Sequence, residues 1–459
     1  MSQNELYSLT LTELAAGLQR RAFSPTEITS AFLERIDSHN DALNAFNLVM
    51  PERAMAEAKA AEALLLVGRA TNPLHGIPYA IKDLFDVSGV VTTAGSKILK
   101  DNIAQEDAFV TRRLADAGMI ALGKTVTVEF ARGIIGVNHI QGTPHNPWHR
   151  TPHIPGGSSC GSAVATAAGL APMALGSDTG GSVRAPAGLC GVVGLKTTVG
   201  RISRSGVFPI SETLDTVGPL ARSVEDCALV YQAMTGEDPR DVSTLGVPTD
   251  NVMHTLKNGV SGLRVGIPTN VFLDALDSEV ELAFDESIRV FESLGAIITR
   301  VAVPEAVPAQ RIGAFLSGAE ACVVHERRLE ERAGDMDHVV GPRMLKDKEI
   351  TAVQYIKALR EAKALRRSLA DTLRDVDVLL MPTTARPALP VDVVDADADT
   401  YIAYSAEYAR NTRIGNVLDM CGVSVPGGFT QHGLPIGLLV CGKAFDEALV
   451  LRAGFAYEQ

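Results

Sequence analysis

Residues 156–200 read GGSSCGSAVATAAGLAPMALGSDTGGSVRAPAGLCGVVGLKTTVG, and this stretch decides how the rest of the chain is interpreted. It contains two Gly-Gly-Ser clusters, which begin at Gly156 and Gly180. Between them lie a small-residue helix pattern over 162–171 and a short apolar strand pattern over 172–175. Because glycine allows backbone conformations that other residues avoid, each cluster can present a serine hydroxyl together with neighbouring N–H groups. The segment therefore suits a nucleophile beside an oxyanion hole.

Two other interpretations fit the same residue types. Gly/Ser-rich stretches often form flexible linkers, although a linker would not be interrupted by apolar runs or continue into GVVGLK (191–196), which predicts a buried strand. A phosphate-binding loop at a helix N-terminus is the second. Residue types alone leave catalysis, a linker and a phosphate loop open.

Two separate motifs then carry a resemblance to the amidase signature family, the serine amide hydrolases that use a Ser-Ser-Lys triad. The second Gly-Gly-Ser ends at Ser182, which matches the family's acyl-accepting serine, and the serine pair begins at Ser158, which matches its bridging serine. The stretch GIPYAIKDLFD (76–86) is similar to the motif that carries the lysine, here Lys82. Further similarity lies in 206–226 and 423–442, so the resemblance covers most of the chain.

The resemblance implies a mechanism that the residue chemistry supports. Serine is a poor nucleophile unless a base removes its proton, and a free lysine with a pKa near ~10.4 is charged at neutral pH. Burial beside apolar neighbours such as Ile81 and Leu84 would lower that pKa. We therefore expect neutral Lys82 to take the proton of Ser182 through Ser158. The relay would return it to the leaving nitrogen before water hydrolyses the acyl-Ser182 ester.

By the same resemblance, the oxyanion hole consists of the backbone N–H groups of Thr179, Gly180, Gly181 and Ser182. Two adjacent glycines let successive N–H groups converge, and the helix pattern that begins near Ser182 adds a favourable dipole.

Residues around these serines are expected to support the loop. In the family the peptide bond before the bridging serine is cis, which here is Gly157–Ser158. Asp178 and Arg184 flank the nucleophile, and an ion pair or hydrogen bonds that brace the loop are favoured over substrate contact. Cys160 stands where the family usually has glycine; a small buried residue is favoured over a catalytic thiol because no partner for a thiol is evident.

The composition limits which classes of partner and which cellular location are expected. The chain has 459 residues, of which 46% are hydrophobic and 21% charged, and a net charge of −12, which argues against nucleic-acid or acidic-membrane partners. It shows no signal peptide and no run long enough to span a membrane. Six cysteines without CxxC spacing indicate free thiols, and a cytoplasmic enzyme is expected. No metal or cofactor is expected.

Element patterns predict an α/β protein. Capping boxes open helices at 10–13 and 24–27, and an Ala-rich helix is expected over 52–67. Strand and helix patterns then alternate, which favours a mostly buried sheet flanked by helices. The family fold implies a single large mixed β-sheet sandwiched between helical layers. The expected strands are 79–81, 119–122, 263–267, 297–303 and 378–381, and the expected helices 107–117, 278–294, 309–332 and 351–375.

One amidase domain over 1–459 is expected. It divides into an N-terminal helical segment (1–68), a signature core (70–230) and a substrate-pocket half with the remaining strands (260–459).

Three other patterns are decoys. Residues 118–125 (GMIALGKT) match the Walker A pattern, but the apolar run inside it predicts a strand after a helix cap at Gly118. Histidines 145, 149 and 153 are four apart, yet the prolines between them exclude a metal-binding helix. Trp148 is expected to be a packing anchor.

The favoured function is a free-standing amidase that hydrolyses a small aliphatic or aromatic primary amide to the acid and ammonia. The alternative resembles the A-type subunit of glutamyl-tRNA(Gln) amidotransferase, which releases ammonia from glutamine for a partner. A catalytically inactive binding protein is disfavoured by the intact triad. Candidate pocket walls are 130–140 (with Arg132, Asn138 and His139), 207–210 and 320–325. Relatives are often homodimers, although the sequence shows no dimer seam.

Overall fold

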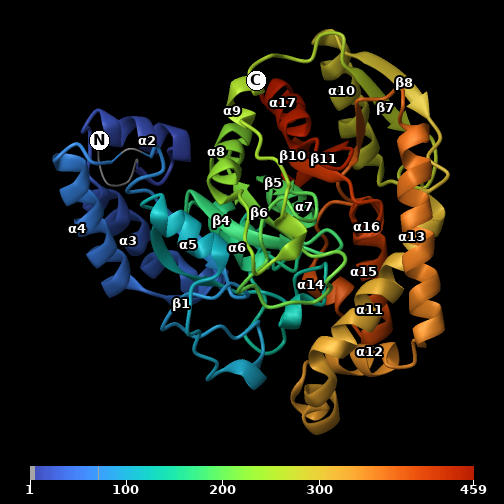
Figure 1. Ribbon diagram of the computed structural model, residues 1–459, viewed down its shortest axis with the longest axis horizontal. Coiled ribbons are helices and arrows are strands. Elements are labelled where there is room, and N and C mark those ends of the chain that lie inside the picture. Colours follow the sequence, from blue (N-terminus) through green and yellow to red (C-terminus); the bar gives the residue numbers. More distant parts are fainter. Residues whose placement is uncertain (1–5, 71) are drawn as a thin grey trace.

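A single mixed sheet of eleven strands runs through the computed structural model, which describes residues 6–70 and 72–459. The strands lie in the order β1-β3-β2-β4-β6-β5-β10-β11-β9-β7-β8, with helices packed around them (Figure 1). Their bounds are β1 Phe46–Val49, β2 Pro78–Lys82, β3 Ile120–Thr125, β4 Met173–Asp178, β5 Val193–Lys196, β6 Thr216–Ala221, β7 Arg264–Pro268, β8 Ile297–Val301, β9 Val378–Pro382, β10 Cys421–Phe429 and β11 Pro435–Gly442. The fold class expected from the sequence is confirmed.

The N-terminal helices begin where the sequence signals predicted. Thr10 and Ser24 each accept the N–H of a glutamate three residues later, and that glutamate reaches back to the cap, so both capping boxes are present. These helices form the blue part of Figure 1 and cover one end of the sheet. Their bounds are α2 Leu11–Gln19, α3 Pro25–Leu43 and α4 Pro51–Leu66.

The signature region forms alternating helices and strands at the centre of the sheet. Strands β2 and β4 are neighbours and run parallel, so their carboxyl ends meet at one edge. Both are buried along their whole length, as the apolar runs predicted. The helices of this region are α5 Phe109–Asp116, α6 Cys160–Ala167 and α7 Arg184–Cys190, with short 3-10 turns at η1 Lys97–Leu99 and η2 Glu129–Ala131.

The later helices build the opposite side of the molecule. Helices α11, α12 and α13 lie on the right of Figure 1, far from the blue N-terminal helices. Remaining bounds are α8 Val224–Met234, η3 Val242–Thr244, α9 Val252–Thr255, α10 Ser278–Ser293, α11 Ala306–Glu331, η4 Ala333–Asp335, α12 Val340–Asp347, α13 Ala352–Thr372, α14 Val391–Val394, α15 Ala398–Tyr408, α16 Arg410–Val417 and α17 Glu447–Glu458.

The Walker-like stretch is a buried strand, as expected. Gly118 has φ +83° after α5, and the apolar residues that follow form β3. Lys124 is buried and donates to Asp83 at 3.2 Å and to the Phe85 carbonyl at 2.6 Å, so its charge is used inside the protein. This stretch therefore forms no phosphate loop.

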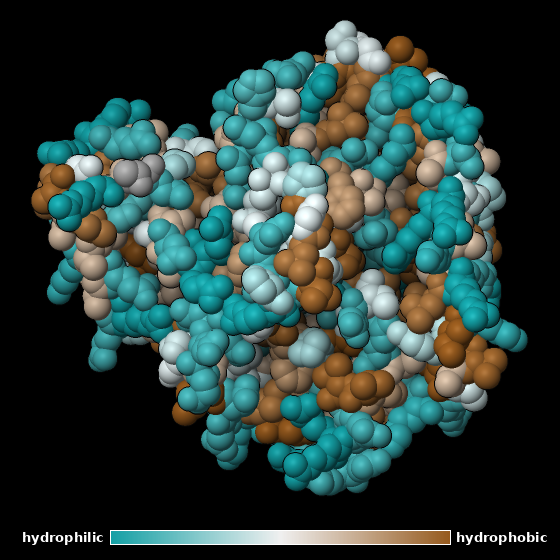
Figure 2. Space-filling view, in the orientation of Figure 1, coloured by the Kyte–Doolittle hydropathy of each residue, from teal (hydrophilic) through white to brown (hydrophobic). Residues whose placement is uncertain are grey.

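Hydrophilic side chains cover most of the face in Figure 2, and hydrophobic ones gather near its middle. No helix of residues 6–70 and 72–459 is long and apolar enough to cross a membrane. The domain ranges given above, of which residues 1–5 and 71 lie outside the described chain, stay a prediction. So does the cytoplasmic location.

Candidate active site

Lys82 is the last residue of β2, and its side chain ends between two serines. Nζ donates to Ser158 Oγ at 2.8 Å and to Ser177 Oγ at 2.9 Å. Ser177 comes from the end of β4, because parallel β2 and β4 deliver their carboxyl ends to the same place. Lys82 is completely buried, and this burial lowers its pKa to about 7. A neutral amine is therefore accessible near physiological pH.

Ser158 is held by a tightly packed loop. The Gly157–Ser158 peptide bond is cis, as the resemblance led us to expect. The Ser158 carbonyl accepts hydrogen bonds from Thr127 Oγ1 at 3.0 Å and from the Val128 N–H at 3.2 Å. A Cβ on Gly157 would lie 2.8 Å from the Cα of Gly136, so only glycine fits there.

Ser182 lies between β4 and α7 and borders a pocket. Its carbonyl accepts the Ser159 N–H at 3.3 Å, which joins the two serine-bearing loops. Its side chain is almost buried, and within the described residues its hydroxyl has no hydrogen-bond partner. The sequence-predicted Lys82 and Ser158 are thus in direct contact, and Ser182 is on the adjoining loop.

Asp178 organises the loop that carries Ser182. Its carboxylate accepts the Gly181 N–H at 2.8 Å and two nitrogens of Arg184 at 3.0 and 2.9 Å. Asn416 of α16 donates to the same carboxylate at 2.8 Å. Burial alone would raise the pKa of Asp178, but Arg184 and Asn416 together hold it well below its usual range. The bracing role expected for Asp178 and Arg184 matches these contacts.

Among the four expected oxyanion donors, the Gly181 N–H is engaged by Asp178. In the described chain, the N–H groups of Thr179, Gly180 and Ser182 form no hydrogen bond with protein acceptors. Gly181 has φ +128°, and a Cβ there would lie 2.0 Å from Oγ1 of Thr412. Thr412 also donates to the Gly180 carbonyl at 2.9 Å, so α16 fixes the turn from the other side.

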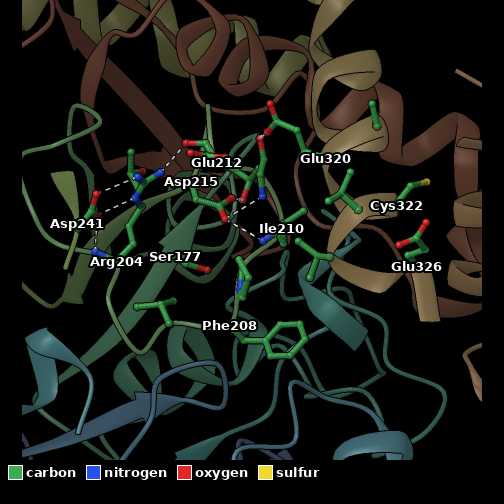
Figure 3. Close-up of a pocket in the computed structure, with 18 of the residues that line it drawn as sticks. Ser177, Arg204, Phe208, Ile210, Glu212, Asp215, Asp241, Glu320, Cys322 and Glu326 are labelled. Atoms are coloured by element: carbon green, nitrogen blue, oxygen red, sulfur yellow. Dashed lines mark hydrogen bonds and ion pairs between the residues drawn. The ribbon is translucent and has the colours of Figure 1, made fainter. Parts of the chain in front are cut away.

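Two cavities adjoin this loop and share Thr179 and Ile210 as lining residues. The smaller, of about 60 Å³, contains Ser182. The larger, of about 920 Å³, contains Ser177 and opens between residues 204–217 and α11. Figure 3 shows Arg204, Asp215 and Asp241 on one side of it and Cys322 and Glu326 on the other. The smaller cavity therefore adjoins Ser182, and the larger one adjoins Ser177.

The expected pocket walls are divided between these cavities. Residues 207–210 and part of 320–325 line the larger one, and Arg132 lines the smaller one. Asn138 instead donates to the backbone carbonyls of Gly95 and Thr127 at 3.0 and 2.7 Å. It braces loops and lines neither cavity.

His139 also lines neither cavity. Its two ring nitrogens bond Asp337 at 2.6 Å and Asp395 at 2.8 Å. Among the described residues, His139, Asp337 and His338 form a group whose side chains are of the kinds that bind metal ions. Because both of its nitrogens already bind carboxylates, His139 offers no free lone pair when protonated.

The structure also places Cys160, Trp148 and the three loop histidines. Cys160 is fully buried, and burial raises the pKa of its thiol to about 12, so a thiolate is disfavoured. Trp148 donates to the Cys190 carbonyl at 2.7 Å and tilts against Phe429, as an anchor would. The loop histidines at 145, 149 and 153 are not on a helix.

Several site residues were missed by the sequence analysis. Ser177 follows the apolar run of β4 directly, and its place beside a second serine motif was the only signal. Asp215 accepts the Thr179 hydroxyl at 2.5 Å, and burial raises its pKa. Arg343 and Arg413 line the smaller cavity, although they lie more than 150 residues from Ser182. No local pattern marks such distant partners.

The chain is similar to known proteins along nearly its whole length. The Amidase family model matches residues 27–451. The A-type subunit of glutamyl-tRNA(Gln) amidotransferase from Trichlorobacter lovleyi is 38% identical, over 99% of this chain and 98% of the relative.

Among solved structures, one is described as an unexpected vestigial protein complex that reveals the evolutionary origins of an s-triazine catabolic enzyme. It superposes with a TM-score of 0.91 at 32% identity, over 98% of both chains. The native peptide amidase from Stenotrophomonas maltophilia gives a TM-score of 0.85 at 31% identity, over 98% of this chain and 96% of that one.

Proposed function

Since this chain belongs to the amidase signature family and is an enzyme of amide C–N bonds, we propose that it hydrolyses a carboxylic acid amide through an acyl-Ser182 intermediate. The observation that carries the proposal is the buried Lys82 amine 2.8 Å from Ser158 Oγ, one loop away from Ser182. No other buried amine of the described chain is placed against a serine pair at a cavity.

In this mechanism, neutral Lys82 accepts a proton from Ser158 as Ser158 accepts that of Ser182. Ser182 Oγ then attacks the amide carbon. The same chain returns the proton to the leaving nitrogen, so that the C–N bond breaks with release of ammonia. Water next attacks the ester carbon and frees the acid.

The developing oxyanion would be stabilised by the N–H groups of Thr179, Gly180 and Ser182, which have no acceptor among the described residues. Gly181 instead stabilises the turn, because its N–H donates to the Asp178 carboxylate. A single well-placed donor is worth roughly 3–4 kcal/mol.

The relatives support one setting for this reaction over the other. Curated relatives that match along nearly the full chain include A-type subunits of the amidotransferase, which supports an ammonia-releasing protein that works with a partner over a free-standing amidase. The free-standing amidase remains a second candidate because the peptide amidase has the same fold at 31% identity. A homodimer stays a prediction.

Ammonia release from a panel of primary amides, with glutamine included, tests the proposal. Wild type should release ammonia, and Ser182→Ala and Lys82→Ala should each abolish release. Co-purified partner proteins that stimulate release would support the amidotransferase setting. Release that survives Ser182→Ala would overturn the assignment of the nucleophile.

A further inference from the structure

The smaller cavity beside Ser182 is lined by three arginines from separate parts of the chain. Arg132 comes from the loop after η2, Arg343 from α12 and Arg413 from α16. Gly313 of α11 makes room for this arrangement, because a Cβ there would lie 3.0 Å from Cγ and Cδ of Arg413. The fold thus brings three cations to the wall of one small cavity.

Only one of these three cations has a counter-charge within the described protein. Asp347 pairs with Arg132, while the side chains of Arg343 and Arg413 form no hydrogen bond or ion pair with the described residues. Burial of Arg413, together with its two arginine neighbours, lowers its pKa to about 10. Such an excess of positive charge is costly unless an anion completes it.

Two buried polar atoms of the cavity residues also lack partners in the described chain. They are Nε of Arg132 and Oγ of Ser405, and both residues are more than nine-tenths buried. A planar carboxylate can accept from several such donors at once, and arginine binds it in a bidentate manner.

The rest of the lining restricts the ligand further. It contains no aspartate or glutamate among the described residues, so an ammonium group would find no carboxylate partner there. The other lining residues are small, apolar or hydroxyl-bearing. A volume of about 60 Å³ corresponds to roughly four to six water-sized groups, which is enough for a short acyl chain.

We propose that this cavity is an anion-binding acyl subsite, and that the substrate is a short amide whose acyl part carries a carboxylate and no ammonium, such as the monoamide of a C3 or C4 dicarboxylic acid. This inference rests on the proposed hydrolysis at Ser182. The amide C–N bond breaks as the Ser182 ester forms, the Ser182 proton leaves with ammonia, and water then breaks the ester to give the dicarboxylate. Glutamine, the ammonia donor of the amidotransferase setting, is a poorer fit because its ammonium accompanies its carboxylate, so this inference favours the free-standing amidase.

The first test compares amides of matched size. Wild type should hydrolyse succinamate with a kcat/KM at least about 100-fold above that of butyramide, and above that of glutamine. Arg413→Met and Arg343→Met should each lower the succinamate-to-butyramide ratio by roughly 10- to 100-fold, mainly through KM. Arg410→Met, on the same helix but outside the cavity lining, is the matched control and should keep the ratio. Equal turnover of succinamate and butyramide, or preference for glutamine, overturns the inference while the proposed function stands.

A binding measurement separates the two proposals. Ser182→Ala protein should bind succinate by calorimetry, and the added Arg413→Met should weaken binding at least tenfold. Arg413→Lys is the second variant in case the methionine fails to fold; it keeps the charge but loses the bidentate geometry, so binding should fall less. If succinate binds in this way but no amide is hydrolysed, the subsite stands and the proposed reaction fails. If succinate does not bind, the inference fails.

Discussion

At the scale of single residues, Lys82 sets the pH dependence of the proposed reaction. Its pKa is lowered to about 7 because the amine is buried. The neutral form is the base and accumulates as pH rises through that value, so kcat/KM should increase about tenfold per pH unit below pH 7 and level above it. A pH–rate profile between pH 5 and 9 checks this. A rate that falls as pH rises through 7 would contradict a neutral lysine base.

Ser177→Ala tests how the second serine tunes that amine. The Ser177 hydroxyl accepts from Lys82 at 2.9 Å, and an ammonium depends on such an acceptor more than a neutral amine does. Its removal should therefore lower the pKa of Lys82 further and move the acidic limb of the profile down by up to about one pH unit. Fitted profiles of both proteins give the shift. Movement to higher pH would mean that Ser177 acts otherwise.

Asp178→Asn tests the ion pair beneath the nucleophile. Asp178 and Arg184 are both fully buried, so loss of the carboxylate leaves a buried guanidinium without a counter-charge. The free energy of unfolding should fall by about 3–5 kcal/mol, measured by urea denaturation. Asp335→Asn removes exposed ion pairs with Arg332 and Lys97 and should change little. Equal losses for the two variants would show that burial does not decide the effect.

At the scale of elements, residue patterns predicted the helices and strands that the local sequence determines. The capping boxes at Thr10 and Ser24 and the buried strand that ends at Lys82 lie where residue patterns placed them. The helix after the serine pair was also predicted, but it begins two residues earlier and ends four residues earlier than the expected 162–171. The antiparallel hairpin β10–β11 was quoted only for its resemblance, and β1 was not predicted. Four residues of β1 are too few for a period to be visible, and their pairing with β3 depends on distant chain.

The turn between β4 and α7 offers a matched pair of glycines. Gly181 has φ +128° and no room for a Cβ beside Thr412, while the nearest atom to a Cβ on Gly180 is Nε of Arg413 at 3.6 Å. Gly181→Ala should therefore lower the stability by about 2–4 kcal/mol through strain and overlap. Gly180→Ala should change it much less. Thermal unfolding of both variants measures the two losses of stability. Similar losses would contradict the close contact between Gly181 and Thr412 of α16.

At the scale of the whole molecule, the site depends on contacts between the two halves of the sequence. The triad residues and Asp178 lie before residue 190, whereas Arg343, Thr412, Arg413 and Asn416 come from helices that begin at or beyond residue 340. The motifs therefore predicted the candidate chemistry, and the sequence placed Arg132 in an expected pocket wall. Arg343 and Arg413 emerged only from the folded chain, because the helices that carry them show no sequence signal beyond ordinary surface charge.

His139 joins three of these distant segments, and its charge should couple their docking to pH. Hydrogen bonds to Asp337 and Asp395 raise the pKa of His139 to about 9, above its usual 6.5. A raised folded-state pKa means that the stabilisation is complete below about pH 6.5 and is lost as pH rises through 9. His139→Gln should therefore destabilise the protein at pH 6 by up to about 3 kcal/mol, less whatever solvent screening removes, and by almost nothing at pH 9.5. Urea denaturation at both pH values measures this, with the exposed His432→Gln as control. A loss for His139→Gln that is independent of pH would mean that shape, and not charge, holds the three segments together.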